Sequence, residues 1–296
     1  MRAGGWGFGA ALACVTASAP ALAAQAKVPL VLHHLIATID TVTWNDVVKS
    51  PFITDQFATI QAPFAHGVDG GRVIRMFGKY NFLQLQPANS AAPLLGDVGM
   101  MLASERPGGL EQIRTQGMFG RPQAYAAWDH GTPATDFYRE WSDRIRPVGA
   151  DSLSDRVRIE LLQYTSDAAK QQTAIDSLSE TNRSSGRFLA QYSDPKKLLA
   201  YLTAATLAVP VDDIRKIVTI LQRDGIPVVA EGEGAIIKLD GFTLHLIPSW
   251  NGAGVKQLQF ALTHPAVANP TYRFGPKSQL RFGPGLIAVW DFENKR

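Results

Sequence analysis

Short runs of apolar and β-branched residues alternate with polar turns in the front part of the chain. The run at 28–40, VPLVLHHLIATID, is typical of a β-strand that ends at Asp40. Gly78 and Lys79 indicate a tight turn between two further strands. The predicted elements are, in chain order, a strand at 28–40, helical turns at 43–48 and 52–60, strands at 72–77, 80–86 and 96–104, and a helix at 107–115.

A similar order of elements returns in the back part of the chain. Apolar residues recur at helical spacing within 211–224, and Gly225 is a typical helix end. Asp240 and Gly241 indicate a hairpin turn. The predicted elements are a strand at 201–209, a helix at 211–224, and strands at 226–230, 235–239 and 242–248.

The two parts also match residue by residue. Residues 82–87 match 242–248 when Pro87 is placed on Pro248 and one residue is allowed to slip, and 36–40 match 206–210. We therefore predict an internal repeat of βαβββ type, spaced about 165 residues apart. The predicted fold class is α+β, with two βαβββ modules that form a curved mixed sheet.

The repeat divides the chain into four segments. We predict a signal peptide at 1–24, a first module at 25–115, a partly helical insertion at 116–196, and a second module at 197–296. Helical pieces within the insertion are expected at 135–144 and 166–179.

The N-terminal segment has the pattern of a secretory signal. Arg2 precedes an uncharged stretch at 6–19, and Ala21, Leu22 and Ala23 form a small-residue cleavage site. We expect a periplasmic or secreted protein. A lipoprotein acylated at Cys14 is the alternative. Since Cys14 is the only cysteine, a mature chain would have neither disulfides nor a catalytic thiol.

Composition narrows the classes of function. The 296 residues are 46% hydrophobic and 19% charged, which is typical of a globular protein with a sizeable core. The net charge of +3 is spread without a run of five Lys or Arg, so no nucleic-acid partner is expected. After signal removal, no segment has the length of an integral membrane span. Phosphate-loop, nucleophile-elbow and H-E-x-x-H motifs do not occur.

The strand from His34 to Asp40, followed by the hairpin at 78–85, resembles the vicinal-oxygen-chelate superfamily. That superfamily includes glyoxalase I, bleomycin-resistance proteins and extradiol dioxygenases. The pair His33 and His34, the segment 50–52 and the closing segment 274–292 are similar to an uncharacterised secreted bacterial branch of glyoxalase-like proteins.

The resemblance implies a cup between two modules that holds a divalent metal, with one ligand from the first and one from the last strand of each module. The corresponding positions are His34 and Gln84 in the first module and Ala204 and His245 in the second. His34 and His245 are thus the candidate metal ligands, and Gln84 is a candidate ligand-binding residue. Ala204 cannot ligate, and the glutamate typical of the last strands is missing from both modules. The alternative for His34 is a structural role, as a buried imidazole that is hydrogen-bonded to the backbone. The alternative for Gln84 is that of a polar residue on a sheet face.

The segment between the modules contains a cluster of aromatic residues. Tyr125, Trp128 and His130 are candidate ligand-binding residues, and Asp129 is placed to support His130 as a general base. The alternative is that these aromatic side chains cover a sheet face. The sequence identifies no catalytic residue.

We expect a secreted glyoxalase-like protein that binds a small polar or aromatic molecule in a cup between the two modules. The resemblance extends this to a metal-dependent lyase or dioxygenase. The alternative is a non-catalytic envelope binding or scaffold protein with a degenerate pocket.

Overall fold

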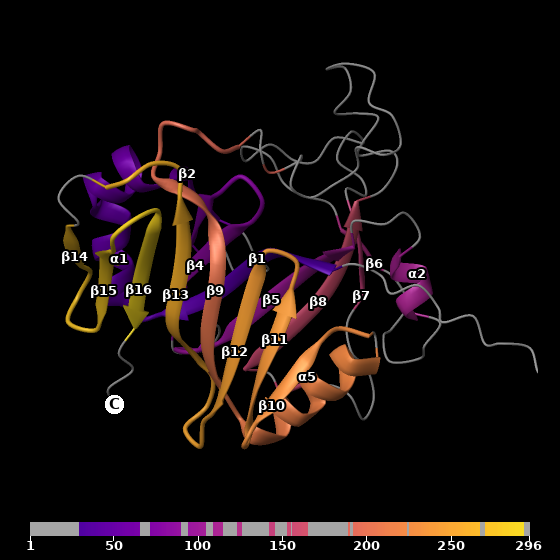
Figure 1. The fold of residues 1–296 in the computed structure, drawn as a ribbon. Coiled ribbons are helices and arrows are strands. Elements are labelled where there is room, and N and C mark those ends of the chain that lie inside the picture. The colour runs from indigo at the N-terminus through magenta and orange to yellow at the C-terminus, as the bar shows by residue number, and fades with distance from the viewer. Residues whose placement is uncertain are drawn as a thin grey trace, which may run out of the picture.

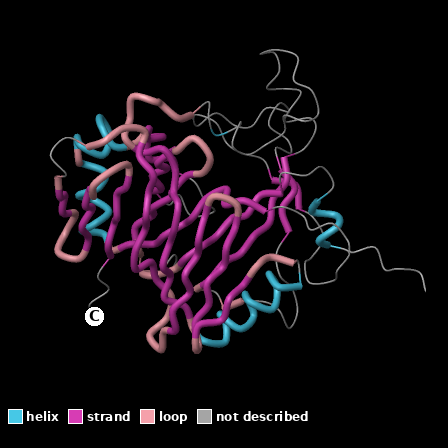
Figure 2. The backbone as a smooth tube through the Cα atoms, in the orientation of Figure 1, coloured by secondary structure: helices cyan, strands magenta, loops and turns pink. Residues whose placement is uncertain are grey.

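The chain folds into two eight-stranded mixed sheets that lie against each other (Figures 1 and 2). The computed structural model describes residues 30–65, 72–89, 94–104, 109–114, 123–125, 142–145, 153–154, 156–164, 189, 192–223, 225–266 and 270–292.

The first sheet has the strand order β2-β3-β4-β1-β5-β8-β7-β6. Its strands are β1 Leu30–Ile39, β2 Thr59–Ala65, β3 Arg72–Phe77, β4 Phe82–Pro87, β5 Val98–Ser104, β6 Gln123–Tyr125, β7 Ser142–Ile145 and β8 Val157–Tyr164. Its helices are α1 Thr41–Lys49, the π-helical turn η1 Phe52–Phe57, and α2 Gly109–Arg114.

The second sheet has the corresponding order, β10-β11-β12-β9-β13-β16-β15-β14. Its strands are β9 Leu199–Val209, β10 Val228–Glu231, β11 Gly234–Leu239, β12 Phe242–Pro248, β13 Gly254–Leu262, β14 Thr271–Arg273, β15 Ser278–Phe282 and β16 Ile287–Phe292. Helix α5 Val211–Arg223 follows β9 in the chain, as α1 follows β1.

The predicted α+β fold class with repeated βαβββ modules is confirmed by these matching strand orders. Ile39 lies opposite Pro87 and Val209 opposite Pro248, so the two prolines occupy the same place in the repeat. The backbone N–H after each proline donates to the strand opposite, from Ala88 to Ile39 and from Ser249 to Val209, both at 2.9 Å.

Each sheet contains a second four-stranded unit that the sequence did not predict, β5–β8 in the first sheet and β13–β16 in the second. The described residues of the segment predicted as a partly helical insertion, 116–196, include β6, β7 and β8, and β8 pairs in parallel with β5. Residues 142–144, expected to be helical, lie in β7, whereas 166–179 lie outside the described residues. Strands of three and four residues are too short to show a period of two.

A further difference concerns the helix predicted at 52–60. The helical turn η1 ends at Phe57, and the edge strand β2 begins at Thr59. Pro63 lies within β2, where the pairing with β3 shifts between Gln61 and Phe64. Proline is tolerated in a strand at such an edge position. Because proline otherwise argues against a strand, the sequence pattern does not predict β2.

The inward faces of both sheets share one hydrophobic core. Strand alternation sends Leu35 and Leu83 of the first sheet and Leu244 and Trp290 of the second into this core. The ring of Phe57 in η1 meets Trp290 edge-on at a centroid distance of 6.5 Å. The described residues thus fill the space between the sheets with side chains, and the expected cup between the modules is not found there. The opposite face of each sheet points outward.

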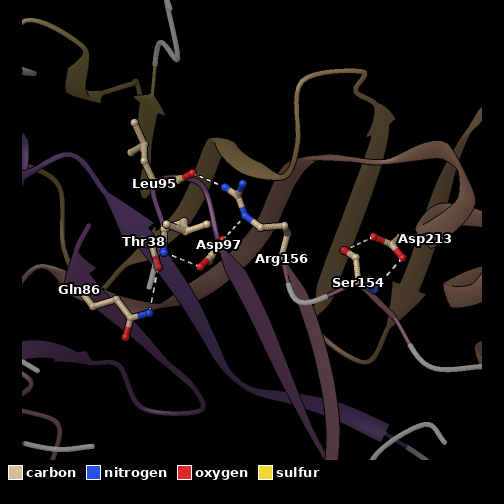
Figure 3. Close-up of polar contacts among 8 residues, drawn as sticks. Thr38, Gln86, Leu95, Asp97, Ser154, Arg156 and Asp213 are labelled. Atoms are coloured by element: carbon tan, nitrogen blue, oxygen red, sulfur yellow. Dashed lines mark hydrogen bonds and ion pairs between the residues drawn. The ribbon is translucent and has the colours of Figure 1, made fainter. Parts of the chain in front are cut away.

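Polar contacts join elements that are distant in sequence. Asp213 of α5 is buried and accepts hydrogen bonds from the Ser154 backbone N–H at 3.0 Å and from its hydroxyl at 2.5 Å, beside the first sheet (Figure 3). Figure 3 also shows the Arg156 guanidinium donating to Asp97 ahead of β5. In the part of the chain that the structure describes, no helix combines the length and apolar character needed to cross a bilayer.

Candidate functional site on the second sheet

The outward face of the second sheet carries a row of polar residues. His245 of β12 lies opposite Thr206 of β9, Thr206 opposite Gln257 of β13, and Gln257 opposite Asp291 of β16. Neighbouring strands are about 4.8 Å apart, so adjacent members of this row are within reach of one another. These are the first and last strands of the two units of the second sheet.

A hollow of about 240 Å³ lies on this face, and we call it the His245 hollow. Its lining consists of Ala204, Ala205, Thr206, His245, Ile247, Gln257 and Gln259. All belong to β9, β12 and β13, so the second sheet alone forms it. Its volume lies just below the usual range of ligand pockets, about 300 to 1,000 Å³, and is suited to a small molecule.

Asp291 is held at the end of the row by two neighbours. Its Oδ1 accepts a hydrogen bond from Gln257 Nε2 at 2.8 Å. Its Oδ2 accepts from Arg281 Nε at 3.1 Å and Nη2 at 2.5 Å. Both carboxylate oxygens are therefore engaged, and the Arg281 guanidinium supplies the positive charge next to them.

These residues do not fit a divalent metal site. The row offers one imidazole and one carboxylate, and the carboxylate already has a cationic partner. Across the described ranges, no three side chains of His, Cys, Asp or Glu lie close enough together to hold one ion. Protein sites for transition metals generally supply at least three such donors.

His34 lies on the first sheet in a buried, largely apolar environment. Its Nδ1 is 2.7 Å from Nδ1 of His33, so one ring donates a hydrogen bond and the other accepts it. Its ring stacks on Phe82 at a centroid distance of 4.3 Å, and the residue opposite on β5 is Met101. These contacts support a structural role for His34.

Gln84 is half-buried on the outward face of β4, where its Oε1 accepts from Arg75 Nε at 3.2 Å. It has the same place in the first sheet as His245 has in the second, three residues before the aligned proline. The structure does not bring His245 together with His34 and Gln84, because they belong to different sheets. Of the three candidates from the segment between the modules, Tyr125 lies in β6 with its side chain undescribed, and Trp128 and His130 lie outside the described residues.

Acidic residues lie on the last strands of the second units, and the sequence did not predict a functional role for them. Glu160 lies on β8 opposite Met101 and is 1% exposed, with Arg158 Nε 3.8 Å from its Oε1. Asp291 occupies β16. Neither residue is predicted from the sequence, because the predicted repeat has only one unit in each half of the chain. The alternation of apolar and polar residues in VRIELLQY and IAVWDF is the signal that indicates these strands.

The family and the fold follow from comparison with known proteins. Residues 32–292 match the profile of a family of unknown function, DUF5829, and the chain belongs to this family. No curated protein matches the chain.

A solved structure of a hypothetical protein from Staphylococcus aureus is 11% identical with a TM-score of 0.51, and the match covers 82% of this chain and 95% of that one. This likeness shows a shared fold. Two further structures are similar at lower scores. One is a xylose isomerase-like TIM barrel/4-hydroxyphenylpyruvate dioxygenase fusion protein, with 13% identity, a TM-score of 0.41, and coverage of 82% of this chain and 37% of that one. The other is a triple mutant of 4-hydroxymandelate synthase from Streptomyces coelicolor, with 13% identity, a TM-score of 0.40, and coverage of 77% and 69%.

Proposed function

We propose that the chain binds a small polar molecule in the His245 hollow, on the outward face of the second sheet. The observation that carries this proposal is the hollow itself, where an imidazole, a hydroxyl and two amides gather over a small apolar floor. A few polar groups over an apolar floor are typical of small-molecule sites.

The lining indicates which ligand groups fit. Gln257 directs its Nε2 to Asp291, so its Oε1 is oriented as an acceptor for a ligand donor. The Thr206 hydroxyl and the His245 imidazole each donate or accept. Ala204 and Ile247 supply the apolar contacts. A neutral molecule with several hydrogen-bonding groups and one apolar side matches this arrangement.

We propose binding rather than metal-dependent lyase or dioxygenase chemistry for this hollow. The donor set around His245 does not fit a divalent metal, because the one carboxylate of the row is paired with Arg281. The test below also distinguishes this proposal from the alternative, in which the protein uses the same fold only as a scaffold.

A ligand screen by thermal unfolding tests the proposal. A ligand at 100 times its Kd stabilises the native state by about 2.7 kcal/mol. We expect the screen to find small polar compounds that stabilise the wild type. This stabilisation should be lost in His245→Ala and Gln259→Ala. Gln84→Ala is the matched control, because Gln84 occupies the equivalent position of the first sheet and should leave binding unchanged. Equal loss in Gln84→Ala, or no stabilising compound at all, would favour the scaffold function.

We further infer that 1–24 is a cleaved signal and that the mature protein is periplasmic or secreted. This inference is supported by the order of features in the segment: a positively charged residue, then an uncharged stretch, then a small-residue cleavage site. N-terminal sequencing of the expressed protein should find a start at 24 or 25. A lipid-modified Cys14 as first residue would instead establish the lipoprotein alternative.

A further inference from the structure

A second hollow on the second sheet gathers positive charge, and we call it the basic hollow. Its volume is about 450 Å³. Four of its lining residues are cationic and one is acidic, and the full lining is Lys256, Arg273, Pro276, Lys277, Ser278, Gln279, Arg281, Asp291 and Phe292. Four positive charges and one negative charge leave a local net charge of +3.

Among the described residues that line the basic hollow, the one carboxylate is already neutralised. Asp291 is bound through both oxygens, by Gln257 and by Arg281. Among the described residues, Lys256, Arg273 and Lys277 have no carboxylate within ion-pair distance. Three uncompensated cations therefore face one hollow, and Lys256 and Lys277 are half-buried, which increases the cost of leaving their charges unpaired.

The strands hold these side chains in fixed places. Arg273 at the end of β14 lies opposite Gln279, which lies opposite Asp291. Lys256 occupies the irregularity in β13 between Val255 and Gln257. These backbone positions are set by the sheet, so the cations need little reorganisation to meet an anion.

The turn that carries Lys277 is packed against α1. Gly275 has a φ of +66°, and its N–H donates to Asp46 Oδ2 at 2.8 Å. An added Cβ at Gly275 would lie 2.9 Å from the Thr43 hydroxyl oxygen, so the close approach requires glycine. This contact fixes the position of the turn relative to the sheet.

The sequence carries a signal for this arrangement. The tetrapeptide Arg-Phe-Gly-Pro occurs at 273–276 and again at 281–284. Both phenylalanines, Phe274 and Phe282, are buried, and both arginines are exposed. In each tetrapeptide, the buried phenylalanine anchors the backbone, and the preceding arginine therefore points outward.

From these observations we infer that the basic hollow binds a small multivalent anion through phosphate or carboxylate groups. Guanidinium forks and lysine ammonium groups are the usual partners of both. The volume lies within the range of small-molecule pockets. The cations converge on one hollow and do not form an extended stripe, which favours a compact anion over a nucleic acid. This inference does not depend on a ligand in the His245 hollow.

Calorimetric titration of the purified full chain with pyrophosphate and with citrate at low salt tests the inference. We expect saturable binding of at least one of them, and a preference between the two would distinguish phosphate from carboxylate chemistry. Lys277→Glu and Arg273→Gln should each weaken binding by about tenfold or more. Lys238→Glu is the matched control: Lys238 is exposed on β11 and does not line the hollow, so its binding should change less than about twofold.

Three results would overturn the inference. The first is the absence of saturable binding by either anion. The second is an equal loss in Lys238→Glu, which would assign the binding to diffuse net charge. The third is binding of a heparin polymer without binding of pyrophosphate or citrate. Arg273→Gln keeps the test valid if the charge reversal at Lys277 disturbs folding, since Arg273 is exposed at a strand end.

Discussion

Asn81 joins the two sheets through a pair of hydrogen bonds, and its replacement tests whether they form one cooperative unit. Its Nδ2 donates to the Leu202 carbonyl at 2.9 Å, and the Leu202 N–H donates to its Oδ1 at 2.8 Å. Leu202 lies on β9 just beyond the point where the pairing with β12 ends at Ala204. The Asn81 side chain therefore pairs with the β9 backbone where β12 no longer does, and it links the first sheet to the second.

The expected effect of Asn81→Ala follows from these contacts. Each hydrogen bond contributes about 1 kcal/mol net, and a buried donor or acceptor left unsatisfied costs about 1 to 3 kcal/mol. Asn81 is 5% exposed and Leu202 2%, so water cannot easily replace the lost partner. We expect Asn81→Ala to lower the free energy of unfolding by about 2 to 4 kcal/mol.

Urea unfolding followed by tryptophan fluorescence and by circular dichroism measures this change. Both probes should report one coincident transition, because the sheets share a core. Gln86→Ala is the control: the Gln86 amide donates one hydrogen bond, to Thr38 at 2.9 Å within the first sheet, and its loss should cost about 1 kcal/mol. The reasoning fails if Asn81→Ala costs no more than Gln86→Ala, or if the two sheets unfold in separate steps.

Two further substitutions and one control test how the halves are joined. Gly96 has a φ of +88°, and a Cβ there would lie 2.1 Å from the Ala253 carbonyl oxygen, so Gly96→Ala should cost about 2 to 5 kcal/mol in urea unfolding. Gly241 has a φ of +68° with open space around it, so Gly241→Ala should cost only about 1 to 2 kcal/mol, and equal costs would contradict the close approach. Asp213→Ala removes the acceptor for the Ser154 N–H and hydroxyl and should cost about 2 kcal/mol by thermal or urea unfolding. A cost below about 0.5 kcal/mol would show that this contact does not join α5 to the first sheet.

The first unit of each half could be predicted because its signals are local. The N-terminus of α1 is capped by Asp40, which accepts from the Thr43 N–H at 2.9 Å and its hydroxyl at 2.7 Å. The match of Pro87 with Pro248 correctly aligned Gln84 with His245.

The second units depend on pairing between strands that are distant in sequence, and the alternation within a single strand does not specify that pairing. The pairing of β5 with β8 joins segments separated by more than 50 residues, and β6 and β7 are stabilised by their place in the sheet. Assigning one unit to each half placed the binding face between the modules. For the same reason, the sequence did not predict Gln257 and Asp291 as members of the row. The strand register places both of them in line with His245.

The most direct test of the binding face is an NMR titration of the isotope-labelled protein with the stabilising compounds found in the screen. We predict saturable shifts of the backbone amides of Thr206, Gln257 and Gln259 and of the His245 ring, with the shifts lost in His245→Ala. Saturable shifts that instead centre on Gln84 and the outward face of the first sheet would contradict the assignment.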